Sequence, residues 1–318
     1  MNNSIPCLWL VVPCYNEEDV LPKSCPKLAD KLKRMIESGI CSKDSRILFV
    51  DDGSQDSTWQ LLEGYHRDNT YVNALKLSRN RGHQNALLAG LMEAKKYCDC
   101  AVSMDCDLQD DIEVLDEFMA KFSEGCDIVY GVRGNRKSDS AFKRKTAQGF
   151  YRFMSFLGAE TVYNHADYRL MSRRALEALG EYKEVNLFLR GIVPLIGFKS
   201  ATVEYSRGKR AAGESKYPFR KMLSFAVEGI TSFSIKPIKF IAGLGILISA
   251  LSVLGLLYAL ISKWTGNAQQ GWTAIVASIW LIGGIQLFCL GIIGEYIGKI
   301  YTEVKGRPKY NIDTFLKK

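Results

Sequence analysis

Four short, largely apolar runs, each ended by polar residues and followed by a helical stretch, constrain the fold of this chain more than any other feature. The runs are Leu8–Pro13, Ile47–Val50, Val72–Leu77 and Ala101–Met104, and a fifth follows at Cys126–Gly131. Strands that alternate with helices of ten or more residues form βαβ units and a mostly parallel sheet. The sequence therefore predicts an α/β fold of this kind.

The polar clusters that end the strands indicate where a ligand binds. In a parallel α/β sheet, ligands bind beyond the carboxyl ends of the strands. Asp51 and Asp52 end the second run, and Asp105 and Asp107 follow the fourth. We therefore expect these four carboxylates to share one cleft at that edge of the sheet.

Asp105 and Asp107 carry the strongest chemical signal in this cleft. Alternate residues of an extended chain point the same way, so both carboxylates can face one point, and Gln109 continues the spacing. Hard oxygen ligands suit Mg²⁺ or Mn²⁺ bound to substrate phosphates. The alternative is a surface acidic turn before a helix, and only the rest of the chain favours the metal site.

Basic residues gather in two later segments, within a formal net charge of +8. One cluster spans residues 133–145, and the other is the loop Arg207–Tyr217. A single cluster of this kind is usually a solvated charged face. Two clusters that flank a metal-binding cleft favour phosphate binding. Nucleic acid is a poor alternative, because no recognised binding motif accompanies the charge.

Two apolar runs near the carboxyl end predict a membrane hairpin. Residues 240–261 and 272–294 each have the ~20 residues needed to span a bilayer. Eight lysines and arginines lie in residues 207–239 and six in 299–318, against one in the link 262–271. This distribution predicts an inner or cytoplasmic membrane protein with two spans, and a catalytic domain and both termini in the cytoplasm. The alternative is a helical hairpin buried in a soluble core.

The expected organisation has four parts. Residues 1–216 form a cytosolic catalytic domain, 217–239 amphipathic helices at the membrane interface, 240–298 two transmembrane helices, and 299–318 a cytosolic basic tail. Gly294 and Gly298 have a spacing that favours helix association and leaves a homo-oligomer open. The nine scattered cysteines fit a reducing compartment better than a disulfide framework or a zinc site.

Six ordered motifs then resemble one enzyme family. They are Val12–Glu18 (VPCYNEE), Val50–Ser54 (VDDGS), Leu77–His83 (LSRNRGH), Asp105–Asp110 (DCDLQD), Asp167–Met171 (DYRLM) and Gly213–Tyr217 (GESKY). Together they look like family 2 glycosyltransferases with the GT-A fold. More narrowly, the chain resembles polyprenyl-phosphate (bactoprenol) glucosyltransferases, which are related to dolichyl-phosphate mannose synthase. Arg81-Gly82-His83 departs slightly from the Phe-Gly-Lys or Phe-Gly-His sequence that is common there.

The resemblance implies roles for individual residues. The nucleotide pocket would be formed by Pro13, Tyr15, Glu17, Asp51 and Asp52. Asp105, Asp107 and Gln109 would hold the divalent ion, and Asp167 lies where inverting members often keep a catalytic carboxylate. The phosphates would be bound by Arg133 and Arg144, on the lipid acceptor, and by Arg207, Arg210, Ser215 and Lys216.

The function implied is metal-dependent, inverting transfer of a hexose to polyprenyl phosphate. UDP-glucose and undecaprenyl phosphate are the first expectation, and the product would serve cell-envelope glycosylation. GDP-mannose with a dolichol-type lipid, or an amino-sugar donor, are alternatives. A processive polysaccharide synthase would usually carry a Gln-x-x-Arg-Trp motif and more spans, and this chain has neither. A membrane scaffold or flippase remains the non-enzymatic alternative, although a scaffold has no use for a metal cleft.

Overall fold

We describe the protein from a computed structural model of the 318-residue chain. The structure describes residues 5–134, 165–184, 188–206 and 271–318, with a few single positions between 238 and 261. The described strands and the helices α1 to α7 belong to one compact unit, and the long helix α10 belongs to a second.

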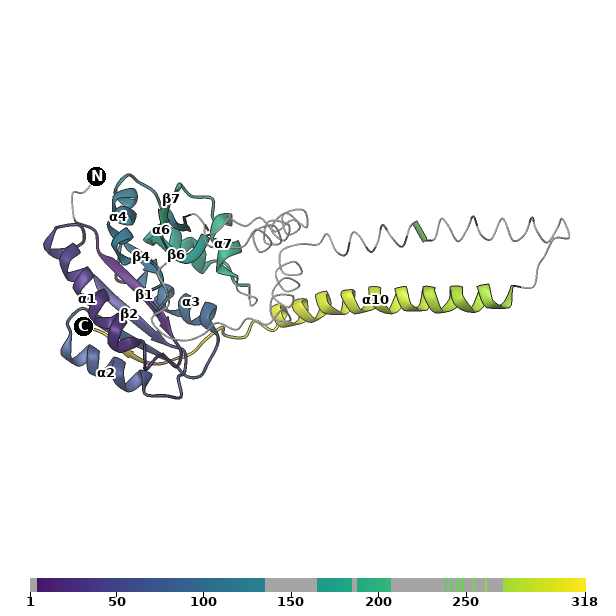
Figure 1. The fold of residues 1–318 in the computed structure, drawn as a ribbon, viewed down its shortest axis with the longest axis horizontal. Coiled ribbons are helices and arrows are strands. Elements are labelled where there is room, and N and C mark those ends of the chain that lie inside the picture. Colours follow the sequence, from purple (N-terminus) through teal and green to yellow (C-terminus); the bar gives the residue numbers. More distant parts are fainter. Residues whose placement is uncertain are drawn as a thin grey trace. The chain divides into compact units, whose positions relative to one another are not determined.

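The first unit is built on one eight-stranded sheet with the order β7-β5-β6-β4-β1-β2-β3-β8. Figure 1 labels β1, β2, β4, β6 and β7 of this sheet. The strands are β1 Leu8–Cys14, β2 Arg46–Asp51, β3 Val72–Leu77, β4 Cys100–Ser103, β5 Ile128–Arg133, β6 His165–Ser172, β7 Ser200–Tyr205 and β8 Ile312–Leu316. The pairs β4–β1, β1–β2 and β2–β3 are parallel. The predicted mostly parallel α/β sheet is therefore confirmed, and the carboxyl ends of its first four strands share one edge.

Helices connect these strands. They are α1 Leu21–Glu37, α2 Thr58–Asp68, α3 His83–Ala94, α4 Leu115–Ser123, α6 Arg173–Gly180 and α7 Leu189–Leu195, and the 3₁₀ turn η1 lies at Ile112–Val114. The turn η1 leads directly into α4. Asp111 caps η1, because its Oδ1 accepts a hydrogen bond of 3.0 Å from the backbone N–H of Glu113.

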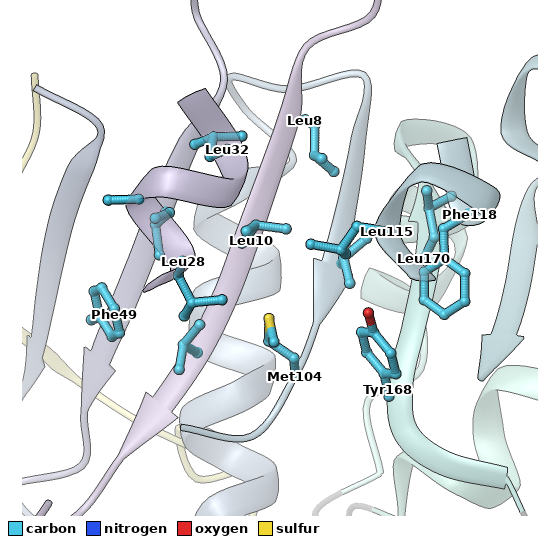
Figure 2. Packing of buried hydrophobic residues seen from close by; sticks show 14 of the residues in the cluster. Leu8, Leu10, Leu28, Leu32, Phe49, Met104, Leu115, Phe118, Tyr168 and Leu170 are labelled. Atoms are coloured by element: carbon cyan, nitrogen blue, oxygen red, sulfur yellow. The ribbon is translucent and has the colours of Figure 1, made fainter. Parts of the chain in front are cut away.

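Alternate residues of β1 pack on opposite sides of the sheet. Leu8 and Leu10 are fully buried in the main hydrophobic cluster with Leu28 and Leu32 of α1 (Figure 2). On the other side, a Cβ added to Gly90 of α3 would lie 2.4 Å from Cγ1 of Val11. Such a contact is too close for any side chain, so glycine lets α3 approach the sheet.

The sheet contains three strands that the apolar runs did not reveal. Strand β6 lies between β4 and β5 and is antiparallel to both. Strand β7 is parallel to β5. Strand β8 comes from the segment predicted to be only a basic tail, and it pairs antiparallel with β3.

Hydrogen bonds hold both ends of β8 to its neighbour. The backbone N–H of Ser78 donates to the carbonyl of Asn311 at 3.0 Å. At the other end, the backbone N–H of Lys318 donates to Oδ1 of the buried Asn73 at 2.9 Å. The edge of β3 is therefore covered by a segment that follows it by more than 230 residues in the sequence.

The second unit contains α10, Trp272–Val304, which includes the residues predicted for the second membrane span. Most of the first predicted span, and the amphipathic segment before it, lie outside the described residues. In the part of the chain that the structure describes, no helix combines the length and the apolarity needed to cross a membrane. The membrane hairpin stays a prediction.

Candidate active site

The turns that follow β1 and β2 are joined by hydrogen bonds. The backbone N–H of Asn16 donates to Oγ of Ser54 at 3.0 Å, and that of Gln55 donates to Oδ1 of Asn16 at 2.9 Å. The backbone N–H of Glu17 donates to Oγ1 of Thr58 at 2.8 Å. Asn16 has a φ of 53°, a left-handed conformation that asparagine tolerates better than most residues. The first two predicted nucleotide-binding motifs therefore form one local structure.

Asp51 and Asp52 are both buried at the end of β2. The two oxygens of Asp52 accept hydrogen bonds from the backbone N–H groups of Arg81, at 2.7 Å, and Gly82, at 2.8 Å. Oδ1 of Asp51 accepts one from the backbone N–H of Ser54 at 3.1 Å. Burial raises the pKa of both carboxyls, and these N–H donors oppose that effect. Asp52 thus ties the turn after β2 to the segment that begins α3.

The loop after β4 carries the predicted metal ligands. Oδ1 of Asp107 accepts a hydrogen bond from the backbone N–H of Gln109 at 3.2 Å, and Gln109 is buried. Leu108, between them, has a φ of 51°. A left-handed leucine stores strain that the surroundings must offset, and such residues occur often at functional sites.

Asp167, on β6, is the centre of a polar network. Its Oδ1 accepts a hydrogen bond from Nη2 of Arg169 at 2.7 Å, and its Oδ2 accepts one from Nη2 of Arg190 at 2.8 Å. Nε2 of Gln84 donates to the same Oδ2 at 3.4 Å. The hydroxyl of Ser103, the last residue of β4, donates to the backbone carbonyl of Asp167. The network therefore joins β4, β6, α3 and α7.

His83 brings this network next to the metal loop. Its Nε2 lies 3.6 Å from Oδ1 of Asp105 and 3.9 Å from Oδ2 of Asp167. His83 is the first residue of α3, and Asp52 holds the backbone just before it. The structure thus gathers Asp105, Asp167 and the Asp52 turn at the carboxyl edge of the sheet, as the sequence predicted for Asp52 and Asp105.

The two arginines determine the charge of Asp167. Burial alone would raise the pKa of its carboxyl, but the guanidinium groups of Arg169 and Arg190 outweigh burial and hold that pKa well below its usual range. Asp167 therefore remains ionised at neutral pH. A carboxylate of such low basicity is a poor proton acceptor, so it is better suited to holding cationic side chains than to general base catalysis.

The residues around Asp105 fit a cation that takes part of its coordination from substrate. Burial raises the pKa of Asp105; His83 opposes this, while the neighbouring Asp110, Asp167 and Asp107 add to it. Among the described residues, no group of three or more His, Cys, Asp or Glu side chains is gathered as a metal site. Two carboxylates with substrate phosphates and water are a normal environment for Mg²⁺, so Asp105 and Asp107 fit a shared site of this kind.

The remaining predicted residues lie in or next to β1, at the end of β5, or outside the described residues. Pro13 lies within β1, and Tyr15 is 42% exposed in the turn that follows. Arg133 is the last residue of β5, in register with Tyr205 of β7. The other predicted phosphate ligands, Arg144, Arg207, Arg210, Ser215 and Lys216, lie outside the described residues.

Four residues whose side chains face the carboxylate of Asp167 were not predicted as site residues: His83, Gln84, Arg169 and Arg190. His83 and Arg169 belong to two of the six ordered motifs, so a signal was present for them. Gln84 follows the third motif directly. Arg190 lies outside all six motifs, and its place in the site is clear only from its contact with Asp167.

Comparison with known families gives two matches along the chain. Residues 9–180 match the family described as glycosyl transferase family 2, and residues 236–300 match the GtrB C-terminal hairpin. The first match covers β1 to β6 and thus all the candidate-site residues before α7.

Individual relatives extend over almost the whole chain. An uncharacterized glycosyltransferase of Bacillus subtilis, YkoT, is 55% identical over 98% of this chain and 93% of its own length. The SfII prophage-derived bactoprenol glucosyl transferase of Shigella flexneri is 37% identical over 95% of this chain and 96% of its own. Among solved structures, one similar protein is the mannosyltransferase PcManGT from Pyrobaculum calidifontis, in complex with GDP-Man and Mn²⁺. It is 14% identical with a TM-score of 0.43, and the match covers 93% of this chain and 88% of that protein's chain.

Proposed function

The chain belongs to glycosyl transferase family 2, and we propose that this glycosyltransferase moves a glucosyl group from UDP-glucose to undecaprenyl phosphate. The observation that carries the proposal is the 37% identity, over 95% of the chain, to a bactoprenol glucosyl transferase. Bactoprenol is undecaprenol, so the acceptor would be a lipid phosphate. The lipid-linked sugar would then serve glycosylation of the cell envelope.

The donor would bind at the carboxyl edge of β1, β2 and β4. Pro13, Tyr15 and Glu17 would contact the nucleoside together with Asp51 and Asp52, as the family resemblance implies. The hydrogen bonds that join the turns after β1 and β2 support this assignment, because they hold the two motifs in a fixed relation before any ligand binds.

Asp105, Asp107 and Gln109 would hold Mg²⁺ or Mn²⁺ against the diphosphate. When bound, the cation would stabilise the negative charge that develops on the departing nucleoside diphosphate. The three ligands are all hard oxygen donors, and mutual repulsion among the carboxylates around Asp105 favours a cation there.

The acceptor needs little help from a base. The second pKa of a phosphate monoester is about 6, so at neutral pH the lipid phosphate is already mostly dianionic and nucleophilic. This agrees with the low basicity of Asp167, which two guanidinium groups keep ionised. Asp167 would therefore orient cationic side chains in the site rather than remove a proton.

The lipid acceptor also calls for membrane attachment, and we include it in the proposal. Support comes from the two apolar runs, the distribution of lysine and arginine around them, and the match of residues 236–300 to the GtrB C-terminal hairpin. Resistance of the protein to extraction from membranes by alkaline carbonate, with protease access to both termini only from the cytoplasmic side, would test this arrangement. Release by carbonate would contradict it.

One assay tests the reaction. The purified protein in detergent is incubated with Mn²⁺, undecaprenyl phosphate and a panel of nucleotide sugars, and lipid-linked product is measured by mass spectrometry. We expect product with UDP-glucose, and loss of product in Asp107→Ala and on chelation of the metal. Product formed only with GDP-mannose or an amino-sugar donor would keep the proposed reaction and replace UDP-glucose as its donor. No product with any donor from a folded protein would overturn the proposal.

A further inference from the structure

The guanidinium of Arg190 is held at the centre of the candidate site while remaining accessible. Its Nη2 lies 2.8 Å from Oδ2 of Asp167, and 41% of its side chain is exposed. Arg169, which binds the other oxygen of the same carboxylate at 2.7 Å, is only 1% exposed. One aspartate thus holds two arginines, of which one is buried and one is open to solvent.

The backbone next to Arg190 is fixed as well. The N–H of Leu189 donates to Oε1 of Gln84 at 3.2 Å, and the carbonyl of Leu189 accepts a hydrogen bond from Nη1 of Arg169 at 3.2 Å. Gln84 and Arg169 also bind Asp167 through their other polar atoms. The same two side chains therefore position both the start of α7 and the carboxylate that holds Arg190.

Structural stabilisation explains Arg169 but not Arg190. A buried carboxylate needs a charged partner, and Arg169 supplies it at full burial. A second, half-exposed arginine on the same carboxylate adds little to stability, because solvent screens such a pair. Holding a flexible, exposed side chain in one orientation is instead what a binding site for an anion requires.

The position of Arg190 indicates which anion it binds. The contacts run from Arg190 through Asp167 to His83, and His83 lies 3.6 Å from the metal-loop residue Asp105. If the proposed function holds, both substrates bring phosphate to this place, and guanidinium groups bind phosphate through paired hydrogen bonds. We propose that Arg190 binds a phosphate group of a substrate and that Asp167 is the residue that positions it.

The test measures binding to the full-length protein in detergent, without turnover. The variants are Arg190→Gln and Arg190→Lys, and the matched control is Arg173→Gln. Arg173 is a suitable control because its side chain is 47% exposed, pairs with Asp99 at 3.2 Å and lies on α6, away from the network. Calorimetry gives the dissociation constants of UDP with Mn²⁺ and of undecaprenyl phosphate. Circular dichroism shows whether each variant folds; if Arg190→Gln does not fold, Arg190→Lys carries the test.

We expect Arg190→Gln to raise the dissociation constant of one of the two ligands by about tenfold or more, which corresponds to loss of a charge-assisted hydrogen bond. Arg190→Lys should have an intermediate effect, and Arg173→Gln should leave both dissociation constants unchanged. Weaker UDP binding would show that Arg190 binds the diphosphate of the donor, and weaker binding of undecaprenyl phosphate would show that it binds the phosphate of the acceptor. Asp167→Asn should weaken the same ligand, and the Asp167→Asn/Arg190→Gln double variant should be no weaker than the worse single variant.

Unchanged binding of both ligands by folded Arg190 variants would overturn the inference, as would a wild-type protein that binds neither ligand. A wild-type protein that binds both ligands but forms no product with any donor would instead overturn the proposed function alone. The two failures are therefore distinguishable.

Discussion

The hydroxyl of Tyr205 donates a hydrogen bond of 2.6 Å to Oδ1 of Asp110, and both side chains are almost fully buried. Asp110 directly follows Gln109, so this bond links the end of β7 to the metal loop. The same loop contains the left-handed Leu108, a conformation that costs about 1–2 kcal/mol. The Tyr205–Asp110 bond helps to hold this strained loop in place.

Tyr205→Phe should therefore weaken binding of the metal. Loss of a hydrogen bond to a charged group corresponds to about tenfold in affinity. The affinity for Mn²⁺ is measured by titrating the metal in the presence of UDP and monitoring the electron paramagnetic resonance signal of free Mn²⁺. Asp110→Asn keeps an oxygen acceptor and should retain more affinity than Asp110→Ala. Tyr65→Phe, on α2, is the control, and equal Mn²⁺ affinities in Tyr205→Phe and wild type would contradict the prediction.

Asp167→Asn should reduce turnover by a similar factor at every pH between about 6 and 9. The folded pKa of Asp167 is depressed below its ordinary value of 3.8, so the ionised form persists throughout this range. Its contribution to stability is present above the unfolded pKa and is lost only as the pH falls through the lower folded value. Pre-steady-state rates across the pH range measure the effect. Recovery of the variant's rate at high pH would instead identify Asp167 as a base.

Gly53→Ala should destabilise the protein much more than Gly39→Ala. Both glycines have positive φ, 68° and 71°, but only at Gly53 would a Cβ meet backbone, 2.6 Å from the carbonyl carbon of Arg79. We expect a loss of about 1 kcal/mol at Gly39, from conformation alone, and about 3 kcal/mol or more at Gly53. Urea denaturation measures both free energies of unfolding. Equal losses would show that the turn after β2 can move away from Arg79.

Leu316→Ala should destabilise the first unit more than Ile312→Ala. Both residues lie on β8, but Leu316 packs against the hydrophobic core, whereas Ile312 is 41% exposed. We expect a loss of about 2 kcal/mol for Leu316→Ala and less than about 0.5 kcal/mol for Ile312→Ala. Urea denaturation measures the free energy of unfolding of both variants. A larger loss of this free energy in Ile312→Ala than in Leu316→Ala would argue against the pairing of β8 with β3.

Local pattern determined which parts of this fold could be predicted. Strands β1, β2 and β4 are built on continuous apolar runs because both faces of a central parallel strand are buried, and the polar residues that follow them mark the ligand edge. Strand β8 has no such run; it becomes a strand because it pairs with the otherwise open edge of β3, a contact between distant segments. Arg190 was missed for the same reason, since its partner Asp167 is 23 residues away.

The order in which the chain is synthesised gives β8 a further consequence. Translation proceeds from the amino end, so β3 is made before the apolar segment 236–300 and β8 after it. Until residues 312–316 leave the ribosome, β3 has an open edge on which another nascent chain could pair. The catalytic sheet is therefore completed only after the hairpin segment has been translated, and a chain interrupted within that segment would expose an unprotected strand.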